Sequence, residues 1–222
     1  NGNHWTEGEI FTCQSVEQLN PANLHFRQCQ FVDCSFAEMV LEKCVFEYCQ
    51  FENCTFSAVK FTQAQLKKCR FSEGHFSQVQ FDQAQSEQTS FSRLRTPGLV
   101  SNGSQWKTCQ FEKVSLEGAT LGDSIWDNCT FAECDLSLVK QQDGKVMASI
   151  FNRCQLRQAH FVNSKLDNGS ILNSDCRGIR FTQCKIGSTT VQQDCDLSQA
   201  TFEHSVLNQV GLRGAMLKGS EF

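Results

Sequence analysis

The chain has 222 residues, with 24 acidic and 20 basic side chains and a formal net charge of -4. Acids and bases are spread evenly over its two halves, which excludes a broad basic surface for nucleic acid or for an anionic membrane, and also excludes the dense acidic stripe of a strong DNA mimic. Residues 1–10 lack the apolar stretch of a secretion signal, and we find no run of about 18 apolar residues that could span a membrane.

The N-terminal segment 1–23 has no regular apolar period and contains Pro21. Terminal units of elongated repeat proteins are usually atypical, because they must cover an otherwise open end. We therefore expect residues 1–23 to form an N-terminal cap and residues 24–222 to form the repeat body.

From Phe26 to Phe81 a large apolar residue, Phe or Leu, stands at every fifth position without exception. A period of five matches neither the 3.6 of a helix nor the 2 of a simple strand. If the small and the large apolar residue of each unit both point inward, each unit is a short extended segment followed by a turn. Four units then close a square coil of 20 residues, and successive coils stack as parallel strands about 4.8 Å apart.

Several units resemble those of the pentapeptide-repeat proteins, which read roughly Ala-Asp/Asn-Leu followed by two variable residues. They include Cys134-Asp135-Leu136, Cys195-Asp196-Leu197 and Ala200-Thr201-Phe202. The resemblance covers residues 24–222. It implies an all-β fold, a right-handed quadrilateral parallel β-helix with four pentapeptides per coil.

The 14 cysteines follow the same period. Twelve of them lie two residues before the large apolar residue of a unit, where other units have Ala, Ser or Gly. This exchange with small residues indicates that Cys is a small buried side chain, and the spacing differs from the closer Cys pairs of structural zinc sites. We predict reduced thiols, no metal or cofactor, and a cytoplasmic location, or delivery into a host cytosol if the chain is part of an effector.

Strict register places phenylalanines on one face of the coil at intervals of 20 residues. We expect these rings to stack as a structural core ladder. Its members are Phe31, Phe51, Phe71, Phe91, Phe111, Phe131 and Phe151.

The period weakens near 96–105, where Thr96 and Ser101 stand in place of large apolar residues and Pro97-Gly98 is a turn signal. The segment either stays in the coil or leaves it as a projecting loop that interrupts the ladder after Phe91, and we expect the loop. Loops on a rigid scaffold often carry function, although this one could be only a tolerated insertion. The candidate partner-binding residues are Arg93, Arg95, Thr96, Pro97, Gly98, Leu99, Val100, Ser101, Asn102 and Gly103.

Three further features lie downstream. An irregularity is expected near 140–149, where Gln141 occupies a large apolar position, and the spacing from Val191 to Leu197 indicates one inserted residue. The chain ends on such a position at Phe222 without a capping segment, so we expect either a continuation of the chain or a dimer formed through this end.

No catalytic constellation stands out, and the five histidines are scattered, so we predict that the chain is not an enzyme. The favoured hypothesis is a non-enzymatic protein–protein interaction scaffold, part of a larger bacterial, effector-like protein, that binds neither nucleic acid nor membranes directly. The alternative follows from a resemblance to quinolone-resistance-type members, with their Phe-rich and Cys-rich coils. It implies a DNA mimic that binds a type II topoisomerase, gyrase or topoisomerase IV, and protects it from quinolones. The chain departs from these members in lacking a C-terminal helical segment and a pronounced negative charge.

Overall fold

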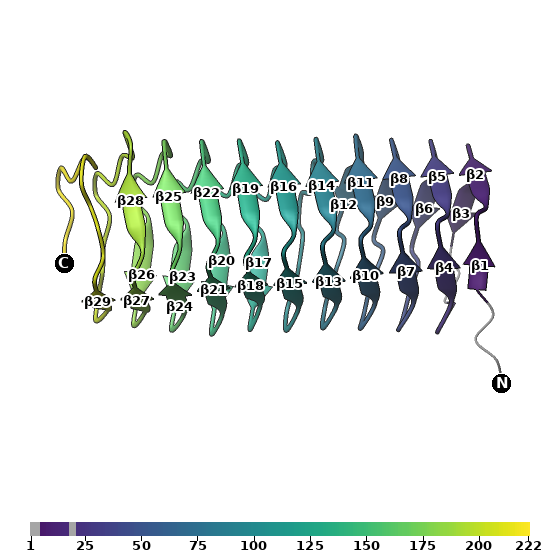
Figure 1. Ribbon diagram of the computed structural model, residues 1–222, viewed down its shortest axis with the longest axis horizontal. Helices are drawn as coiled ribbons and strands as arrows, with labels where there is room; N and C mark the ends of the chain where they lie inside the picture. Colours follow the sequence, from purple (N-terminus) through teal and green to yellow (C-terminus); the bar gives the residue numbers. More distant parts are fainter. Residues whose placement is uncertain (1–4, 18–20) are drawn as a thin grey trace.

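The described chain, residues 5–17 and 21–222 of the computed structural model, winds into a right-handed quadrilateral parallel β-helix, which confirms the fold predicted from the sequence (Figure 1). Residues 20 apart lie side by side on neighbouring coils, as in the pairing of Phe51 with Phe71. Each coil has four sides of one pentapeptide, numbered here as sides 1 to 4 in chain order. No α-helix occurs in the described ranges.

Side 1 is a sheet of 11 strands: β1 (Trp5–Glu7), β4 (His25–Arg27), β7 (Val45–Glu47), β10 (Gln65–Lys67), β13 (Gln85–Glu87), β15 (Gln105–Lys107), β18 (Ile125–Asp127), β21 (Lys145–Met147), β24 (Lys165–Asp167), β27 (Lys185–Gly187) and β29 (Val206–Asn208). Side 2 is a sheet of 10 strands: β2 (Ile10–Thr12), β5 (Gln30–Val32), β8 (Gln50–Glu52), β11 (Arg70–Ser72), β14 (Ser90–Ser92), β16 (Gln110–Glu112), β19 (Thr130–Ala132), β22 (Ile150–Asn152), β25 (Ser170–Leu172) and β28 (Thr190–Gln192).

Sides 3 and 4 carry four strands each. Those of side 3 are β3 (Ser15–Glu17), β6 (Ser35–Ala37), β9 (Thr55–Ser57) and β12 (His75–Ser77). Those of side 4 are β17 (Thr120–Gly122), β20 (Lys140–Gln142), β23 (His160–Val162) and β26 (Arg180–Thr182). Elsewhere these two sides continue as single parallel bridges between turns.

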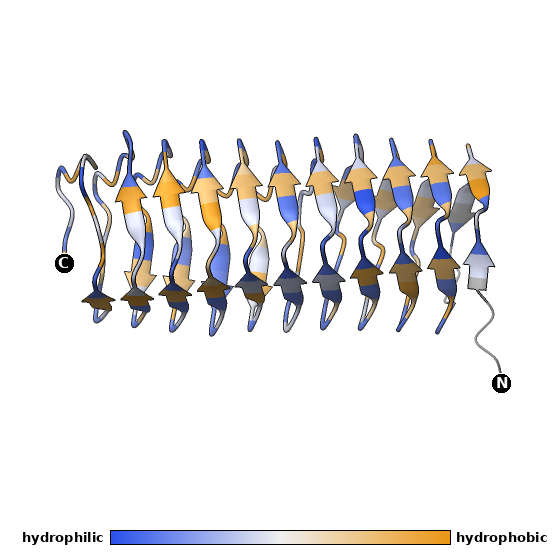
Figure 2. Cartoon of the chain, in the orientation of Figure 1, coloured by the Kyte–Doolittle hydropathy of each residue, from blue (hydrophilic) through white to orange (hydrophobic). Residues whose placement is uncertain are grey.

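The five-residue period follows from the geometry of one side and one corner. In β8, Phe51 is buried between the exposed Gln50 and Glu52. Asn53 turns the corner with a φ of 50°, and its N–H donates to the carbonyl of Ser72 on the next coil at 2.8 Å. The next residue, Cys54, is buried again. Hydrophobic and hydrophilic segments therefore alternate in every coil (Figure 2).

The buried cysteines share one environment. The Cys54 thiol lies 3.3 Å from the carbonyl oxygen of Phe31 and 3.4 Å from that of Glu52, so it can donate to either. Ser164 uses its hydroxyl in the same way toward Val162. Burial raises the pKa of Cys54 to about 12, which keeps the thiol protonated. All cysteines except Cys13 are buried and free, as expected for small core side chains.

The side 2 phenylalanines stack without interruption from Phe11 to Phe151. Their ring centroids lie between 4.5 Å, for Phe51 and Phe71, and 5.1 Å, for Phe71 and Phe91. The stacking continues past Phe91 to Phe111 at 5.0 Å. Of the two arrangements left open by the sequence, the structure therefore has the unbroken ladder.

The expected projecting loop at 96–105 does not exist, and that prediction is corrected here. Thr96 and Ser101 are buried, and residues 95 and 100 bridge to both neighbouring coils. Gly98 takes the ordinary corner position, with a φ of 69°. The turn signals that suggested an extruded loop mark a corner that every coil has.

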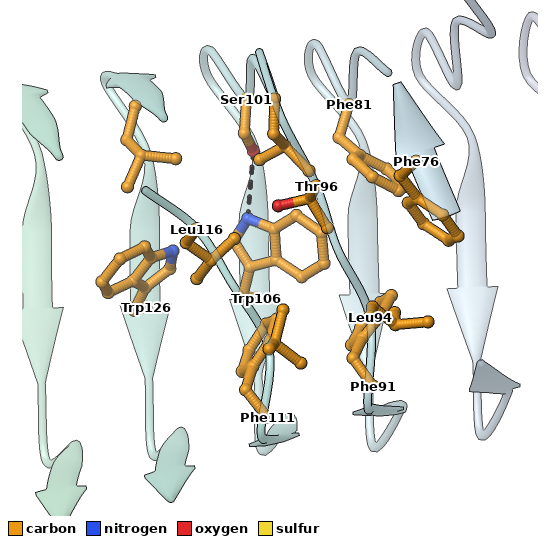
Figure 3. Close-up of a pocket in the computed structure, with 13 residues that line it drawn as sticks. Phe76, Phe81, Phe91, Leu94, Thr96, Ser101, Trp106, Phe111, Leu116 and Trp126 are labelled. Atoms are coloured by element: carbon orange, nitrogen blue, oxygen red, sulfur yellow. Dashed lines mark hydrogen bonds between the residues drawn. The ribbon is translucent and has the colours of Figure 1, made fainter. Parts of the chain in front are cut away.

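The small residues in this region make room for Trp106, which explains why the pattern was misread. The Trp106 indole N–H points at the Ser104 hydroxyl, 2.8 Å away, and at the Ser101 hydroxyl, 3.2 Å away (Figure 3). Only a void of about 20 Å³ is left around it. That volume is close to the minimum of about 10–15 Å³ that holds one water, so the indole fills the space that Ser86, Thr96 and Ser101 leave.

The expected irregularity at 140–149 is corrected in the same way, since β20 and β21 keep the regular pairing. Gln141 is buried, and its amide nitrogen donates to the carbonyl of Ser124 at 3.2 Å. A Cβ at Gly144 would collide with the Gln141 side chain, so the glycine accommodates the glutamine.

The N-terminal segment differs from the expected cap, whereas the residue expected to be inserted before Leu197 is present. β1, β2 and β3 pair in register with β4, β5 and β6, so the described part of 1–23 is a coil of the helix and not a separate cap. Residues 1–4 and 18–20 of that segment lie outside the described chain. Beyond Val191 the pairing shifts to 21 residues, as in Asp175 with Asp196, which confirms the inserted residue.

Candidate functional site

The residues proposed as a partner-binding loop are spread over three corners and two sides of the coil. Leu99 is buried with Thr96 and Ser101, and Arg93 forms an ion pair with Glu73 at 3.4 Å. The Asn102 side-chain oxygen accepts a hydrogen bond from the Gly122 N–H at 3.0 Å. These contacts hold the segment to its neighbouring coils and do not assemble a projecting site.

A different region stands out by its charge. Residues 140–186 contain eight Lys and Arg against three Asp and no Glu, whereas the rest of the chain has 12 basic and 21 acidic residues. The even distribution between the two halves therefore conceals a basic segment of three coils.

The basic segment lines a shallow groove along the corner between sides 3 and 4. Lys140 on β20 pairs with His160 on β23, which pairs with Arg180 on β26, so two cationic side chains and a histidine between them stand in one row on consecutive strands. The residues that line this basic groove are Gly118, Leu138, Lys140, Gln158, His160, Gly178, Arg180 and Gln199.

The row is not neutralised within the described residues, where neither Lys140 nor Arg180 takes part in an ion pair within 4.0 Å. Like charges directly opposite on neighbouring strands destabilise a sheet by about 0.2–1 kcal/mol each. His160 separates Lys140 from Arg180, so protonation of its ring would place like charges directly opposite on both neighbouring strands.

Side 1 shows how the same fold avoids this cost. One column of outward side chains alternates in charge over seven consecutive strands, and its Arg27 guanidinium lies 3.9 Å from the Glu47 carboxylate. The column consists of Glu7, Arg27, Glu47, Lys67, Glu87, Lys107 and Asp127. Alternation is thus available to this chain, and the basic groove departs from it.

His160 lies at the centre of the row and is half-buried. Its Nε2 lies 3.0 Å from the Thr182 hydroxyl. Desolvation, together with the charges of Arg180 and Lys140, lowers the pKa of His160, while Glu203 opposes that change. An anion in the groove would offset the desolvation and the repulsion, and would favour the protonated ring.

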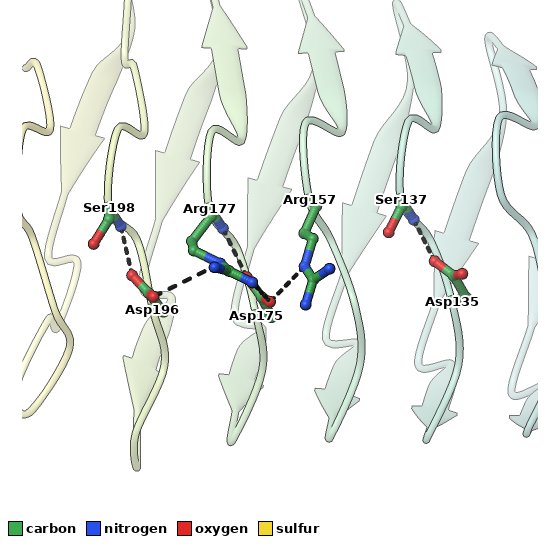
Figure 4. A network of polar contacts seen from close by, with 7 residues as sticks. All are labelled: Asp135, Ser137, Arg157, Asp175, Arg177, Asp196 and Ser198. Carbon is green, nitrogen blue, oxygen red and sulfur yellow. Dashed lines mark hydrogen bonds and ion pairs between the residues drawn. The ribbon is translucent and has the colours of Figure 1, made fainter.

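Side 3 carries a network in which the nearby arginines are already paired (Figure 4). Asp175 accepts hydrogen bonds from Arg157 at 2.5 Å and from Arg177 at 2.7 Å, and Arg177 also lies 3.8 Å from Asp196. Arg177 and then Arg157 lower the pKa of Asp175 to about 2 against the desolvation. The stability that this network contributes is present above the ordinary carboxyl pKa of 3.8 and is lost as the pH falls toward 2.

A second row of cations lies on side 1 and shares two of its three coils with the groove. Lys145, Lys165 and Lys185 stand in register on β21, β24 and β27. Lys165 forms an ion pair with Asp167 at 3.1 Å, so this lysine column is partly neutralised. The column is therefore basic like the groove, but it has an acidic partner beside it.

Leu138 gives the basic groove an apolar contact point. Its side chain is 45% exposed, and it turns a corner with a φ of 59°. The neighbouring corners of the same column have Gly118, Gln158 and Gly178, so Leu138 is the exposed apolar side chain among them.

This groove was not predicted from the sequence, because the charge summed over each half of the chain conceals the basic segment. The available signal was the spacing of 20 residues between Lys140, His160 and Arg180, and again between the three lysines of side 1. Among the described residues, no group of three or more His, Cys, Asp or Glu side chains is arranged to hold a metal ion, and no helix there could cross a membrane.

Comparison with known families gives matches along most of the chain. A model described as the pentapeptide repeat region matches residues 16–99 and 104–190, and a model described as pentapeptide repeats matches residues 193–222. The sequence matches no curated protein.

Solved structures with the same fold include a trypsin-treated variant of QnrB1, a plasmid-mediated fluoroquinolone resistance protein. It is 15% identical, with a TM-score of 0.54 over 91% of this chain and 90% of that one. The ORF18 protein of Geobacillus virus E2 is 10% identical, with a TM-score of 0.55 over 91% of this chain and 53% of that one. At these identities the likeness is one of fold.

Proposed function

Because the chain belongs to the pentapeptide repeat family, we propose that it is a non-enzymatic scaffold that binds a partner protein along its outer faces. The basic groove and the lysine column form the docking surface. The abundance of free, buried thiols supports a reducing, cytoplasmic location.

The observation that carries this proposal is the row of Lys140, His160 and Arg180 on three consecutive coils, in which neither Lys140 nor Arg180 has an ion-pair partner among the described residues. The stacked coils fix the spacing of these side chains through continuous backbone hydrogen bonds, so a partner meets a rigid charged surface. Complementary charge on the partner would speed association and select the partner.

A capture experiment tests the scaffold function. Proteins retained by the immobilised wild-type chain are purified and their binding to the chain is measured in solution. Reversing four cations of the docking surface should weaken that binding by about tenfold or more, because close charge pairs between proteins contribute about 1.5–7 kcal/mol. The four substitutions are K140E, K145E, R180E and K185E.

A matched variant controls for net charge. It carries the same number of reversals on exposed bases of the acidic part of the rod, and binding should change much less. The substitutions are K60E, K67E, R70E and K107E. Equal losses in both variants, or no retained protein that binds in solution, would contradict the proposal.

A second candidate is a DNA mimic that binds a type II topoisomerase. It is supported by the fold shared with QnrB1 and by the excess of 17 acidic over 10 basic residues in 1–139. If it is correct, the purified chain should inhibit supercoiling by gyrase, or preserve it in the presence of a fluoroquinolone. Unchanged supercoiling under both conditions rules out this candidate and leaves the scaffold function standing.

A further inference from the structure

We propose that the basic groove binds an acidic α-helix of a partner protein, laid parallel to the axis of the rod, with carboxylates on successive turns facing Lys140, His160 and Arg180. The proposal rests on the scaffold function above and names the kind of segment that this part of the surface takes.

The spacing of the row favours a helix over an extended segment. Neighbouring strands lie about 4.8 Å apart, so the outer two cations are separated by about 9.6 Å along the axis. Carboxylates on one face of a helix recur about every 5.4 Å and cover about 10.8 Å in the same two steps. Same-face side chains of an extended strand recur about every 6.7 Å and would overrun the row by nearly 4 Å.

The surroundings favour a protein segment over nucleic acid. The row is short, because Thr120 and Thr201 flank it on the neighbouring coils. Duplex DNA has one charge per about 1.7 Å and is usually held by about 6–10 phosphate contacts. A phosphate backbone that continued beyond the row would approach the acidic residues of 1–139. An acidic helix can instead be as short as the row itself, and one apolar side chain on it can contact Leu138.

The protonation of His160 should make binding in the groove depend on pH. The charged groups around the ring are Lys140, Arg180 and Glu203, and its hydrogen-bond partner is Thr182. Carboxylates bound over the row would raise the pKa of His160 from its lowered value, so binding takes up a proton. Affinity should therefore increase as the pH falls from about 7.5 to about 6, where carboxylates of the helix are still ionised.

The probe is an Ala-rich, fluorescently labelled helical peptide of about 18 residues, with Glu three or four residues apart on one face and a Leu beside them. Its isomer has the same composition with the Glu residues placed around the helix. Fluorescence anisotropy with the full chain should give an affinity for the one-face peptide that is about tenfold higher than for the isomer, because only the one-face peptide can contact Lys140, His160 and Arg180 at once.

Variants separate the groove from general electrostatics. K140E/R180E should weaken binding of the one-face peptide by at least about tenfold, whereas K60E/K107E, which changes the net charge equally at exposed bases of the acidic part of the rod, should weaken it by less than about twofold. Circular dichroism shows whether charge reversal disturbs the fold. If it does, the neutral variant K140A/R180A replaces K140E/R180E and should also weaken binding of the one-face peptide. H160Q should abolish the increase in affinity at low pH.

Several results would overturn the inference. These are equal affinity for the two isomers, equal losses in K140E/R180E and K60E/K107E, or no binding of the one-face peptide at low salt. Tighter binding of a DNA duplex that depends on the same groove residues would assign the site to nucleic acid instead. If the peptides fail while captured proteins still depend on the docking surface, the scaffold function stands and only the helical ligand is wrong.

Discussion

Replacing Phe71 with alanine should lower the free energy of unfolding by about 3–5 kcal/mol, the range for deleting a buried aromatic ring. Phe71 is 1% exposed and stacks between Phe51 and Phe91, with ring centroids at 4.5 and 5.1 Å. Both stacking contacts are lost at once, and neighbouring coils cannot collapse into the gap because their spacing is fixed by backbone hydrogen bonds.

Urea unfolding followed by circular dichroism and by tryptophan fluorescence measures this loss. The two probes are needed because repeat proteins do not always unfold in one transition. Phe11→Ala is the matched control, because Phe11 belongs to the same ladder but is only half-buried. It should cost less than half as much, and a loss below about 1 kcal/mol for Phe71→Ala would contradict a close-packed ladder.

Replacing Ser101 with phenylalanine should also destabilise the chain, although it restores the five-residue pattern. Ser101 is fully buried, and its hydroxyl lies 3.2 Å from the Trp106 indole nitrogen. A ring at this position would overlap the space of the indole, and overpacking of a filled core costs about 1–3 kcal/mol or more. If residues 96–105 formed a projecting loop, the same substitution would be nearly neutral.

The matched variants are Ser101→Ala and the double mutant S101F/W106A. The alanine keeps the volume small and removes one of two hydroxyls near the indole N–H, so it should cost only about 1 kcal/mol. In the double mutant the new ring can occupy the space left by Trp106, and the two losses should be less than additive in thermal unfolding. Full additivity would show that residues 101 and 106 do not share a cavity.

Much of the fold could be predicted because each unit repeats the same physical constraints. Phe51 must be buried, Gln50 and Glu52 must be exposed, and Cys54 must be small, because its side chain lies inside the coil next to the backbone of the preceding coil. These requirements act within five residues, so they appear directly in the sequence. The inserted residue before Leu197 was visible for the same reason.

The predictions of a projecting loop at 96–105 and of an irregularity at 140–149 were wrong because the volume of one side chain there compensates for that of another. Ser101 appeared to break the pattern because the larger Trp106 that fills its space lies on the next side of the coil. Gln141 appeared equally irregular, although Gly144 provides the room for its side chain. Composition of a unit does not reveal such exchanges of volume, since they depend on which side chains meet inside the coil.

The sequence by itself determined the coil, its four sides and the alternation of buried and exposed positions, because these follow from the local period. Only the tertiary structure decided that residues 96–105 remain in the coil and that Lys140, His160 and Arg180 form one unneutralised row. The physical reason is the same in both cases. Residues 20 apart in the chain become nearest neighbours only when the coil closes, so the match of volumes and charges between coils is set by their stacking.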